Sequence, residues 1–591
     1  MSQSRQQSLA FDPAADAMAA FRNAKALARC RAESSPESDR LGMARSFCGA
    51  MLRAYWQAKC GALGLTWDIF DLPPVQQQLD RAARDLAESL GCIAAHVDDL
   101  AAGYMLGTVY TSMLPSNLRA QWGSFYTPPP YVDRLLDQAG AAGFNWATGT
   151  AADPACGGGA FLAPIALRMW KAGGQIDADA ALADVCARLR GFELDPFAAW
   201  MSHVVLEATL LPLCAAARRR MPFLISVGDS LLIADDAQFD LVVGNPPYGK
   251  VTLPNEVRAK FSRTLYGHAN LYGLFTELGV RLCKRGGVVA FVTPTSFLGG
   301  QYFKALRKFL LAEAPPSFID FISGRDGVFD DVLQETMLAV YVKGGQASEV
   351  AVCALETGPG GIVVNSEIGR RKISGLSGPW LIARNTRHGA IIEKMTSMTL
   401  RLADYGYSVS TGPLVWNRHK DQLRHVADST THPLVWAESV SMEGFKFSAK
   451  KRNHAPYVAP SLDQGHLVLN EEAVLVQRTT AKEQARRLIC AVIDTNFMRR
   501  TNGVVVENHL NIVKARATSE IKPPTIARVL NSRAADEAFR CISGSVAVSA
   551  YELNALPLPC RVDMLALQRL VEQQASEQLI EKRLCRIYGV E

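Results

Sequence analysis

The tetrapeptide Asn245-Pro246-Pro247-Tyr248 is the part of the sequence whose residue types point most directly to chemistry. It follows an apolar run, and two consecutive prolines fix φ and cannot continue a strand ladder. We therefore expect a rigid loop at the carboxyl end of a strand, the edge at which α/β folds bind ligands. There the side-chain oxygen of Asn245 and the carbonyl oxygen of Pro246 can each accept one hydrogen of an aromatic amine. Held in this way, the nitrogen lone pair points at an electrophile without a strong base, and Tyr248 can stack on the ring.

A glycine-rich loop precedes this tetrapeptide and reads Asp-Pro-Ala-Cys-Gly-Gly-Gly-Ala-Phe over residues 153–161. Three glycines let the backbone turn sharply and approach a ligand closely. A dinucleotide-binding loop would read Gly-x-Gly-x-x-Gly, whereas here an acidic residue comes before the glycines. Asp153 can pair with an ammonium group, which suits the amino-acid end of S-adenosyl-L-methionine better than a pyrophosphate. The candidate cofactor contacts in this loop are Asp153, Ala155, Gly157 and Gly159.

Two later carboxylates extend this interpretation. Glu193 stands at the expected end of the second strand, where an acidic side chain can accept both ribose hydroxyls of a nucleoside. Asp229 stands at the end of the third strand unit and can accept a hydrogen bond from an adenine amine. Acidic residues at strand ends are also common helix caps, so each is weak by itself. Their order and spacing after the glycine loop favour a nucleoside-binding site.

The surrounding pattern indicates which elements would hold these residues. Residues 119–345 alternate short apolar runs with amphipathic helices, which is typical of a doubly wound, Rossmann-like α/β sheet. Residues 1–118 carry apolar positions at helical spacing. After 366, strand-like pieces lie among polar loops, which predicts an α+β domain. Residues 563–589 are predicted to form one amphipathic helix.

Composition excludes several classes of protein. With 48% hydrophobic and 20% charged residues the chain is an ordinary globular protein, and its net charge of +6 permits nucleic-acid binding without demanding it. The 13 cysteines include no Cys-x-x-Cys pair or zinc-like quartet, so we expect reduced thiols and no metal site. The first ten residues lack the apolar core of a signal peptide, and no run approaches the ~20 apolar residues of a membrane span. We therefore expect a soluble, cytoplasmic protein with no membrane partner.

These motifs, in this order, resemble the gamma class of N6-adenine DNA methyltransferases of restriction–modification and phage-defence systems. The resemblance implies a Rossmann-like catalytic domain that uses S-adenosyl-L-methionine and acts on a flipped-out adenine in double-stranded DNA. Family members carry a Tyr-Thr-Pro element before the glycine loop, so Tyr126 and Thr127 would contact the methionine part of the cofactor. The family also presents an aromatic side chain to the flipped base, a role that falls here on Phe329. The element 270–275 matches a supporting helix behind the adenine pocket.

The second half of the chain matches the target-recognition domains of the same class more loosely. Basic pairs and triplets cluster after residue 366, and they can neutralise phosphates while Trp, Asn and Gln reach bases or sugars. A solvated basic face is the alternative for any single cluster. The predicted DNA contacts are Trp416, Arg418, Lys420, Gln477, Arg478, Lys482 and Asn508. The predicted domains are a helical region (1–118), a catalytic domain (119–365), a target-recognition domain (366–560) and a C-terminal helix (561–591).

Three other functions stay open. The same tetrapeptide chemistry serves RNA adenine methyltransferases and protein glutamine methyltransferases, and a non-catalytic DNA-binding subunit is a third alternative. A fused nuclease is not expected, because neither lysine of residues 1–120, Lys25 or Lys59, stands in an Asp/Glu-x-Lys motif. The amino-terminal region is therefore predicted to be a helical brace or a DNA clamp. A separate restriction endonuclease or other defence-system subunits are the expected protein partners.

Overall fold

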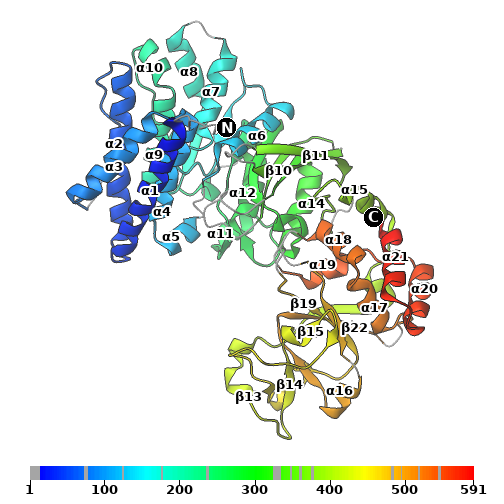
Figure 1. Cartoon of the computed structure of the whole chain (residues 1–591). Coiled ribbons are helices and arrows are strands. Elements are labelled where there is room, and N and C mark those ends of the chain that lie inside the picture. Colours follow the sequence, from blue (N-terminus) through cyan, green and yellow to red (C-terminus); the bar gives the residue numbers. More distant parts are fainter. Residues whose placement is uncertain are drawn as a thin grey trace, which may run out of the picture.

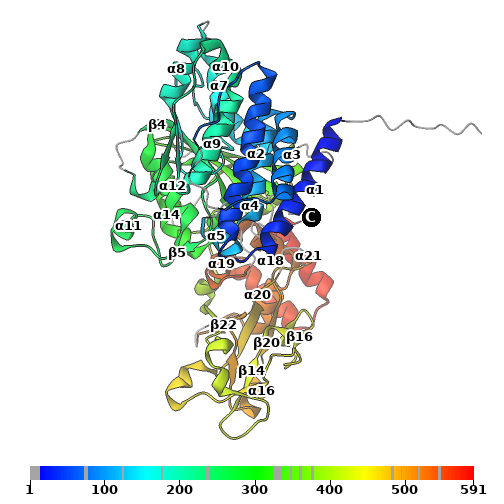
Figure 2. The same ribbon diagram turned by 90° about the vertical axis from the view of Figure 1, so that its left-hand side faces the viewer.

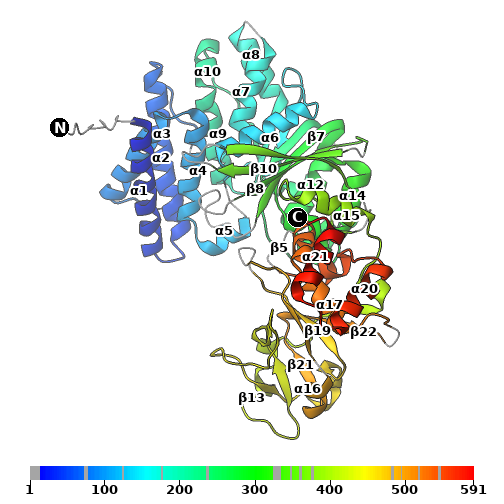
Figure 3. The same ribbon diagram turned by 45° about the vertical axis from the view of Figure 1, so that its right-hand side comes forward.

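The computed structural model places a helical amino-terminal region, a central sheet domain and a carboxy-terminal lobe in sequence order (Figure 1). The orange and red helices near the carboxyl terminus lie between the sheet domain and the yellow strands (Figures 1 and 3). The structure describes residues 13–71, 73, 77–122, 126–174, 177–233, 238–323, 335–346, 349–357, 363–373, 378–480, 485–493, 495–516, 519–543 and 547–590.

The amino-terminal region consists of helices that pack closely together. The Asp80 side chain caps α3 by accepting a hydrogen bond from the backbone N–H of Ala83. A Cβ at Gly91 of α3 would overlap the carbonyl of Met51 in α2, so glycine lets these two helices approach closely. The apolar faces of these helices continue into the sheet domain as one core. The helices accordingly lie beside the sheet domain (Figure 2). The helices are α1 (Pro13–Ser34), α2 (Arg40–Ala62), α3 (Arg81–Ala95), α4 (Asp99–Met113) and α5 (Ser116–Trp122).

The central domain is a nine-stranded sheet in the order β11-β10-β8-β9-β7-β4-β1-β2-β3. Strands β7, β4, β1, β2 and β3 are parallel, whereas β9 runs antiparallel between β7 and β8. This confirms the predicted α/β class. The strands are β1 (Ala151–Asp153), β2 (Leu189–Glu193), β3 (Ile225–Val227), β4 (Phe239–Gly244), β7 (Cys283–Pro294), β8 (Pro316–Ser323), β9 (Thr336–Val342), β10 (Glu349–Thr357) and β11 (Val363–Lys372).

Helices cover both faces of this sheet, and the strand sequences show why. In β4, Leu241 and Val243 pack into one core, which includes the amino-terminal helices, while Val242 between them packs into a second core on the opposite face. Alternate residues of a strand point to opposite faces, so a run that is apolar throughout is buried on both. The helices are α6 (Pro129–Ala141), α7 (Leu162–Gly173), α8 (Ala178–Arg188), α9 (Pro196–Thr209), α10 (Leu211–Ala217), α11 (Asn255–Lys260), α12 (Leu271–Leu282), α13 (Ser296–Gly299) and α14 (Lys304–Glu313).

The predicted domain boundary at residue 365 is wrong, because it cuts through β11. This strand pairs antiparallel with β10 along its whole length, from Glu349 opposite Lys372 to Thr357 opposite Val363. It is the edge strand of the nine-stranded sheet, and most of its side chains are exposed. Its polar sequence therefore lacks the apolar alternation by which the inner strands are recognised.

The carboxy-terminal lobe combines two small sheets and a two-stranded pair, β15 (Val440–Ser441) with β16 (Gly444–Phe445), with a group of helices. The sheets have the strand orders β12-β22-β19-β20 and β13-β17-β14-β21-β18. Their strands are β12 (Tyr407–Thr411), β13 (Leu423–Arg424), β14 (His432–Val435), β17 (Tyr457–Val458), β18 (Val468–Leu469), β19 (Ala473–Gln477), β20 (Cys490–Ile493), β21 (Val504–Val506) and β22 (Leu510–Ala515). The helices are α15 (His388–Ser397), α16 (Thr495–Arg500), α17 (Pro523–Leu530), α18 (Arg533–Ile542), α19 (Ala550–Ala555), α20 (Arg561–Glu572) and α21 (Glu577–Tyr588).

The single carboxy-terminal helix predicted over 563–589 is also wrong, because the structure divides it into α20 and α21. Between them Gln574 adopts a left-handed φ of 53°, and the Ser576 side chain caps the second helix at the Leu579 N–H. Both helices contribute to the same apolar core as α15, α17 and α18. The apolar stripe therefore continues through the break, which is why periodicity alone predicts one helix.

Within the described residues, no single helix is long and apolar enough to cross a membrane, and one bent pair, α9 with α10, passes that test only by length and composition. Among the same residues, no group of three or more His, Cys, Asp and Glu side chains is arranged to hold a metal ion.

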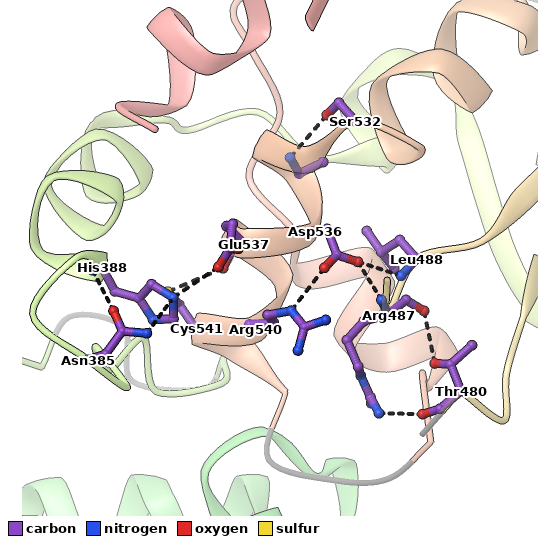
Figure 4. Close-up of polar contacts among 11 residues, drawn as sticks. Asn385, His388, Thr480, Arg487, Leu488, Ser532, Asp536, Glu537, Arg540 and Cys541 are labelled. Carbon is purple, nitrogen blue, oxygen red and sulfur yellow. Dashed lines mark hydrogen bonds and ion pairs between the residues drawn. The ribbon is translucent and has the colours of Figure 1, made fainter. Parts of the chain in front are cut away.

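A buried carboxylate on α18 fixes the start of β20 (Figure 4). Asp536 is 2% exposed, and its Oδ1 accepts hydrogen bonds from the backbone N–H groups of Arg487 (2.6 Å) and Leu488 (2.7 Å). Its Oδ2 accepts from Arg540 Nε at 2.9 Å. The next residue of α18, Glu537, pairs with His388 of α15 at 3.1 Å (Figure 4). The helix thus joins two segments that are distant in the sequence.

Asp536→Ala should lower the free energy of unfolding of the carboxy-terminal lobe by about 3 kcal/mol, because two buried backbone N–H groups lose their acceptor. Urea titration of the full chain measures the change. Glu577→Ala is the control, since it breaks only the exposed ion pair with Arg528 and should have little effect. A loss for Asp536→Ala no larger than that of the control would contradict this account.

Candidate cofactor and substrate site

The carboxyl ends of four neighbouring parallel strands bring the predicted chemical residues around one cavity of about 370 Å³. Asp153 ends β1, Glu193 ends β2, Asp229 follows β3 and Asn245 follows β4. All four line this cavity, although they are far apart in the sequence. A cavity of this size holds a ligand such as a nucleoside.

The glycine loop has the close geometry that its sequence predicts. Gly157 and Gly159 have positive φ values of 52° and 86°, which L side chains rarely adopt. The Gly157 N–H donates to Glu193 Oε2 at 2.8 Å, so the loop is tied to the end of β2. Gly157 and Ala155 line the cavity, whereas a Cβ at Gly159 would lie 2.7 Å from Ser202 Oγ of α9. Gly159 therefore serves the close packing of the loop on α9.

The cavity wall is acidic. Asp153 is buried, and burial raises the pKa of its carboxyl group to about 8 although Oδ1 accepts a hydrogen bond from the Ala155 N–H. Burial also raises the pKa of Glu193. Among the described residues that line the cavity there is no lysine, arginine or histidine. Such a wall favours a ligand that brings positive charge and hydrogen-bond donors, and it disfavours a pyrophosphate.

Tyr126 and Thr127 reach the same cavity from the segment that precedes α6. The Tyr126 ring lies between two glycines, because a Cβ at Gly107 of α4 or at Gly158 of the loop would overlap it. Thr127 is 1% exposed, and its hydroxyl has no hydrogen-bond partner among the described residues. A buried hydroxyl beside a cavity is unfavourable until a ligand satisfies it. Both residues therefore lie where a cofactor could contact them.

The tetrapeptide forms a turn at the end of β4, with Asn245 and Pro247 lining the cavity and Pro246 buried. The Tyr248 hydroxyl donates to Asn245 Oδ1 at 2.7 Å and also lies 3.3 Å from the Val292 carbonyl oxygen. The Tyr248 ring is 8% exposed and meets Tyr272 edge-on, with 6.0 Å between the ring centroids. In this structure Tyr248 thus orients the Asn245 amide, and its predicted stacking on a base stays a prediction.

The remaining predicted catalytic residue, Phe329, lies outside the described residues. The predicted supporting element 270–275 forms the start of α12, and its Leu271 and Phe275 line the cavity beside Asn245. They give the acidic cavity an apolar side, against which a planar ring can pack.

The predicted DNA contacts that the structure describes come together in the carboxy-terminal lobe. Lys420 Nζ lies 5.7 Å from the centroid of the Trp416 ring, and Arg418 of the same turn is exposed. Arg478 Nη1 donates to the Asn508 carbonyl oxygen at 3.1 Å. The Asn508 N–H donates to the carbonyl oxygen of residue 414, just before the turn that holds Trp416, Arg418 and Lys420. The Arg478–Asn508 pair therefore lies beside that turn.

Two of the predicted DNA contacts differ from this group. The side-chain nitrogen of Gln477 donates to the carbonyl oxygens of Ala437 (3.2 Å) and Val440 (2.6 Å), so only its amide oxygen is left for a nucleic acid. Lys482 lies outside the described residues.

Sequence reasoning gave no role to several polar residues of the cavity wall, among them Tyr110 and Asp195. The motif 193–196 contains a signal for Asp195, because an acidic residue before Pro196 is typical of a helix N-cap. The structure has this cap at the start of α9, where Asp195 accepts a hydrogen bond from the Phe197 N–H. No local signal identifies Tyr110, which comes from the amino-terminal helix α4.

The raised pKa of Asp153 makes stability depend on pH. The carboxyl group has an ordinary pKa of 3.8 in the unfolded chain and one of about 8 in the folded protein, so the folded state is favoured at low pH and loses this contribution as the pH rises toward 8. Asp153→Asn, which stays neutral, should gain stability relative to the unchanged protein between pH 5 and about 8, and should level off above. The free energies of unfolding of the variant and of the unchanged protein, both without ligand, measure this difference. A constant difference from pH 5 to 9 would contradict the raised pKa of Asp153.

Comparisons with known proteins agree with this geometry. The family model described as Eco57I restriction-modification methylase matches residues 215–329, which include the turn after β4. The Type II methyltransferase M.BsuBI of Bacillus subtilis is 28% identical over 355 residues, which cover 58% of this chain and 70% of the relative. The Type II methyltransferase M.PstI of Providencia stuartii is 28% identical over 353 residues, covering 56% and 68%.

A solved structure extends the similarity of fold to nearly the whole chain. The Type IIL restriction-modification enzyme MmeI, solved in complex with DNA, aligns with a TM-score of 0.58 at 13% identity, covering 98% of this chain and 96% of that one. At this identity the likeness concerns the fold alone. The sequence matches confirm that this chain is similar to the methyltransferases of restriction–modification systems, as its motifs indicate.

Proposed function

We propose that this chain is a site-specific DNA adenine-N6 methyltransferase that uses S-adenosyl-L-methionine in a restriction–modification or phage-defence system, acting on DNA in the cytoplasm. The observation that carries the proposal is the position of the Asn245-Pro246-Pro247 turn. It opens onto the same cavity as the acidic, glycine-rich loop, so an amine held at the turn lies next to a ligand held by the loop.

The residues around the cavity fit this cofactor. Asp153 would hold its ammonium group, and the unsatisfied Thr127 hydroxyl would bind its methionine part beside Tyr126. Glu193 would accept the ribose hydroxyls, and Asp229 the adenine amine. When bound, S-adenosyl-L-methionine supplies an electrophilic methyl group on a positively charged sulfur. The acidic wall lowers the free energy of that positive charge.

The turn would position the target amine. Asn245 Oδ1 and the Pro246 carbonyl oxygen would accept its two hydrogens and direct the nitrogen lone pair into the cavity. An amide oxygen has two lone pairs, so Asn245 Oδ1 can accept from Tyr248 and from the amine together. The cofactor would leave as a neutral thioether, so the residues of the turn would not need to include a strong base, and the proton that the amine gives up would pass to solvent. Positioning of the amine by Asn245 and Pro246 would supply the acceleration.

The adenine must leave the DNA duplex to reach this turn. Phe329 would pack on the flipped base. The carboxy-terminal lobe would hold the duplex, with its basic residues on phosphates and its amide and aromatic groups at bases or sugars. We propose the contacts Trp416, Arg418, Lys420, Gln477, Arg478, Lys482 and Asn508. A separate restriction endonuclease or another defence-system subunit would be the protein partner.

Asn245→Ala should reduce methyl transfer to duplex DNA at least 10³-fold, because the amine loses one of its two acceptors and its orientation. Binding of the product S-adenosylhomocysteine should stay within about twofold of the unchanged protein. Transfer of a labelled methyl group to DNA, with identification of N6-methyladenine, measures the first quantity, and calorimetry measures the second. Asn365→Ala on the exposed edge strand β11 is the matched control.

The same assay separates the other functions. Transfer to RNA or to a glutamine-containing protein instead of duplex DNA would favour the RNA adenine or protein glutamine methyltransferase. DNA binding without transfer to any of the three acceptors would favour a non-catalytic subunit. Survival of activity in Asn245→Ala would show that the proposed chemistry is wrong.

Tyr248→Phe removes only the hydroxyl that donates to Asn245 Oδ1. We expect kcat to fall about tenfold, the equivalent of about 1.4 kcal/mol, because the amide orientation is no longer fixed. The affinity for S-adenosylhomocysteine should not change, since Tyr248 does not line the cavity. An unchanged kcat, with methyl transfer shown to limit the rate in a single-turnover experiment, would contradict this role.

A further inference from the structure

An ionic contact between a half-buried arginine and a buried carboxylate joins the amino-terminal helices to the glycine-loop side of the cavity. Arg45 Nη2 of α2 donates to Asp195 Oδ1 at 2.7 Å, and the Tyr110 hydroxyl of α4 donates to Asp195 Oδ2 at 2.6 Å. Asp195 is 6% exposed and also caps α9. Its two carboxylate oxygens are therefore held by groups from two helices that lie far away in the sequence.

Asp195 in turn touches the residue that we assign to the ribose. Its backbone N–H donates to Glu193 Oε1 at 2.9 Å, while the Gly157 N–H donates to Glu193 Oε2 at 2.8 Å. The Glu193 carboxylate is thus fixed at both oxygens, one through the glycine loop and one through Asp195. Any rotation of the Asp195 backbone would move one of these two anchors.

Helix α4 also contacts the wall of the cavity at Tyr126, close to the glycine loop. Gly107 lies directly under the Tyr126 ring, which lies on Gly158 of the glycine loop. Tyr110, one turn along the same helix, lines the cavity together with Tyr126 and Asp195. Helix α4 thus positions the Tyr126 ring over the glycine loop. Through Asp195 it also positions the Glu193 carboxylate beside that loop.

We propose that Arg45 and Tyr110 are positioning residues for cofactor binding, acting through Asp195 on the orientation of Glu193. This inference rests on the proposed function, because it takes the ligand of the cavity to be S-adenosyl-L-methionine. The amino-terminal region then completes the cofactor site and is more than a brace. Its role lies in ground-state binding of the nucleoside part, away from the amine that reacts.

The apolar core offers an independent means of holding these helices in place. Met51 and Leu52 of α2 and Leu106 and Val109 of α4 are buried in the same core as Val205 of α9. Packing of this kind does not need the Arg45–Asp195 pair. Loss of the pair should therefore alter the pocket without detaching the helices.

The test measures S-adenosylhomocysteine binding to the full chain by calorimetry, together with the thermal midpoint and the methylation kinetics. Arg45→Met and Tyr110→Phe should each weaken binding about tenfold. The KM for S-adenosyl-L-methionine should rise by a similar factor, and kcat should change less than threefold. Arg45→Lys, which retains a cation, should recover part of the affinity. Arg31→Met is the control, because it breaks an exposed ion pair with Asp80 in the same helical region.

The outcomes separate this inference from the proposed function. Unchanged affinity in both Arg45→Met and Tyr110→Phe, with or without a lower thermal midpoint, would overturn the inference and leave the methyltransferase assignment intact. The unchanged protein could bind S-adenosylhomocysteine but transfer no methyl group to DNA, and the variants could bind it more weakly. That result would support the inference and would contradict DNA as the proposed substrate. No binding of S-adenosylhomocysteine by the unchanged protein would overturn both. Tyr110→Phe removes one hydroxyl only, so it gives a result even if Arg45→Met fails to fold.

Discussion

The constraint on which the site depends is the gathering of acidic side chains at the ends of parallel strands, around a cavity whose described lining contains no basic residue. Burial disfavours the charged form of a carboxyl group, so such a wall is costly until positive charge or hydrogen-bond donors enter it. The raised pKa of Asp153 expresses this cost. A dinucleotide would worsen it, whereas a sulfonium with an ammonium group relieves it, so charge selects the class of ligand before any shape is considered.

Close backbone approach is the second condition, and it explains the glycines. The loop must come near enough to Glu193 for the Gly157 N–H to reach its carboxylate, and near enough to α9 that Gly159 has no room for a side chain. Gly244, which ends β4, has the same purpose, since a Cβ there would lie 2.6 Å from Asp153 Oδ1. The turn that begins at Asn245 is therefore anchored directly beside the acidic loop, and the distance between the two chemical groups is set by the sheet.

The sequence predicts the positions of Glu193, Asp229 and Asn245 because each follows a strand, and the carboxyl ends of parallel strands share one edge. Prediction fails where local pattern and three-dimensional structure differ. The polar edge strand β11 has no apolar alternation, and the apolar stripe of α20 continues into α21, so the pattern does not show the break between the two helices. The contacts of Asp195 with Arg45 and Tyr110 join residues far apart in the chain, so no periodicity or motif announces them.

The amino-terminal helices show how a region without sequence motifs can still help to form the candidate site. A helix that packs on α9 by apolar contacts alone would be free to shift by small amounts, because such contacts are not directional. An arginine paired with a buried carboxylate fixes direction, since the energy of the pair is lost when its geometry is lost. The Asp195 N–H donates to Glu193, to which we assign the ribose, so this pair couples the position of the helices to the shape of the cavity. We infer that this directional contact, rather than the larger apolar interface, is what makes the amino-terminal region part of the site.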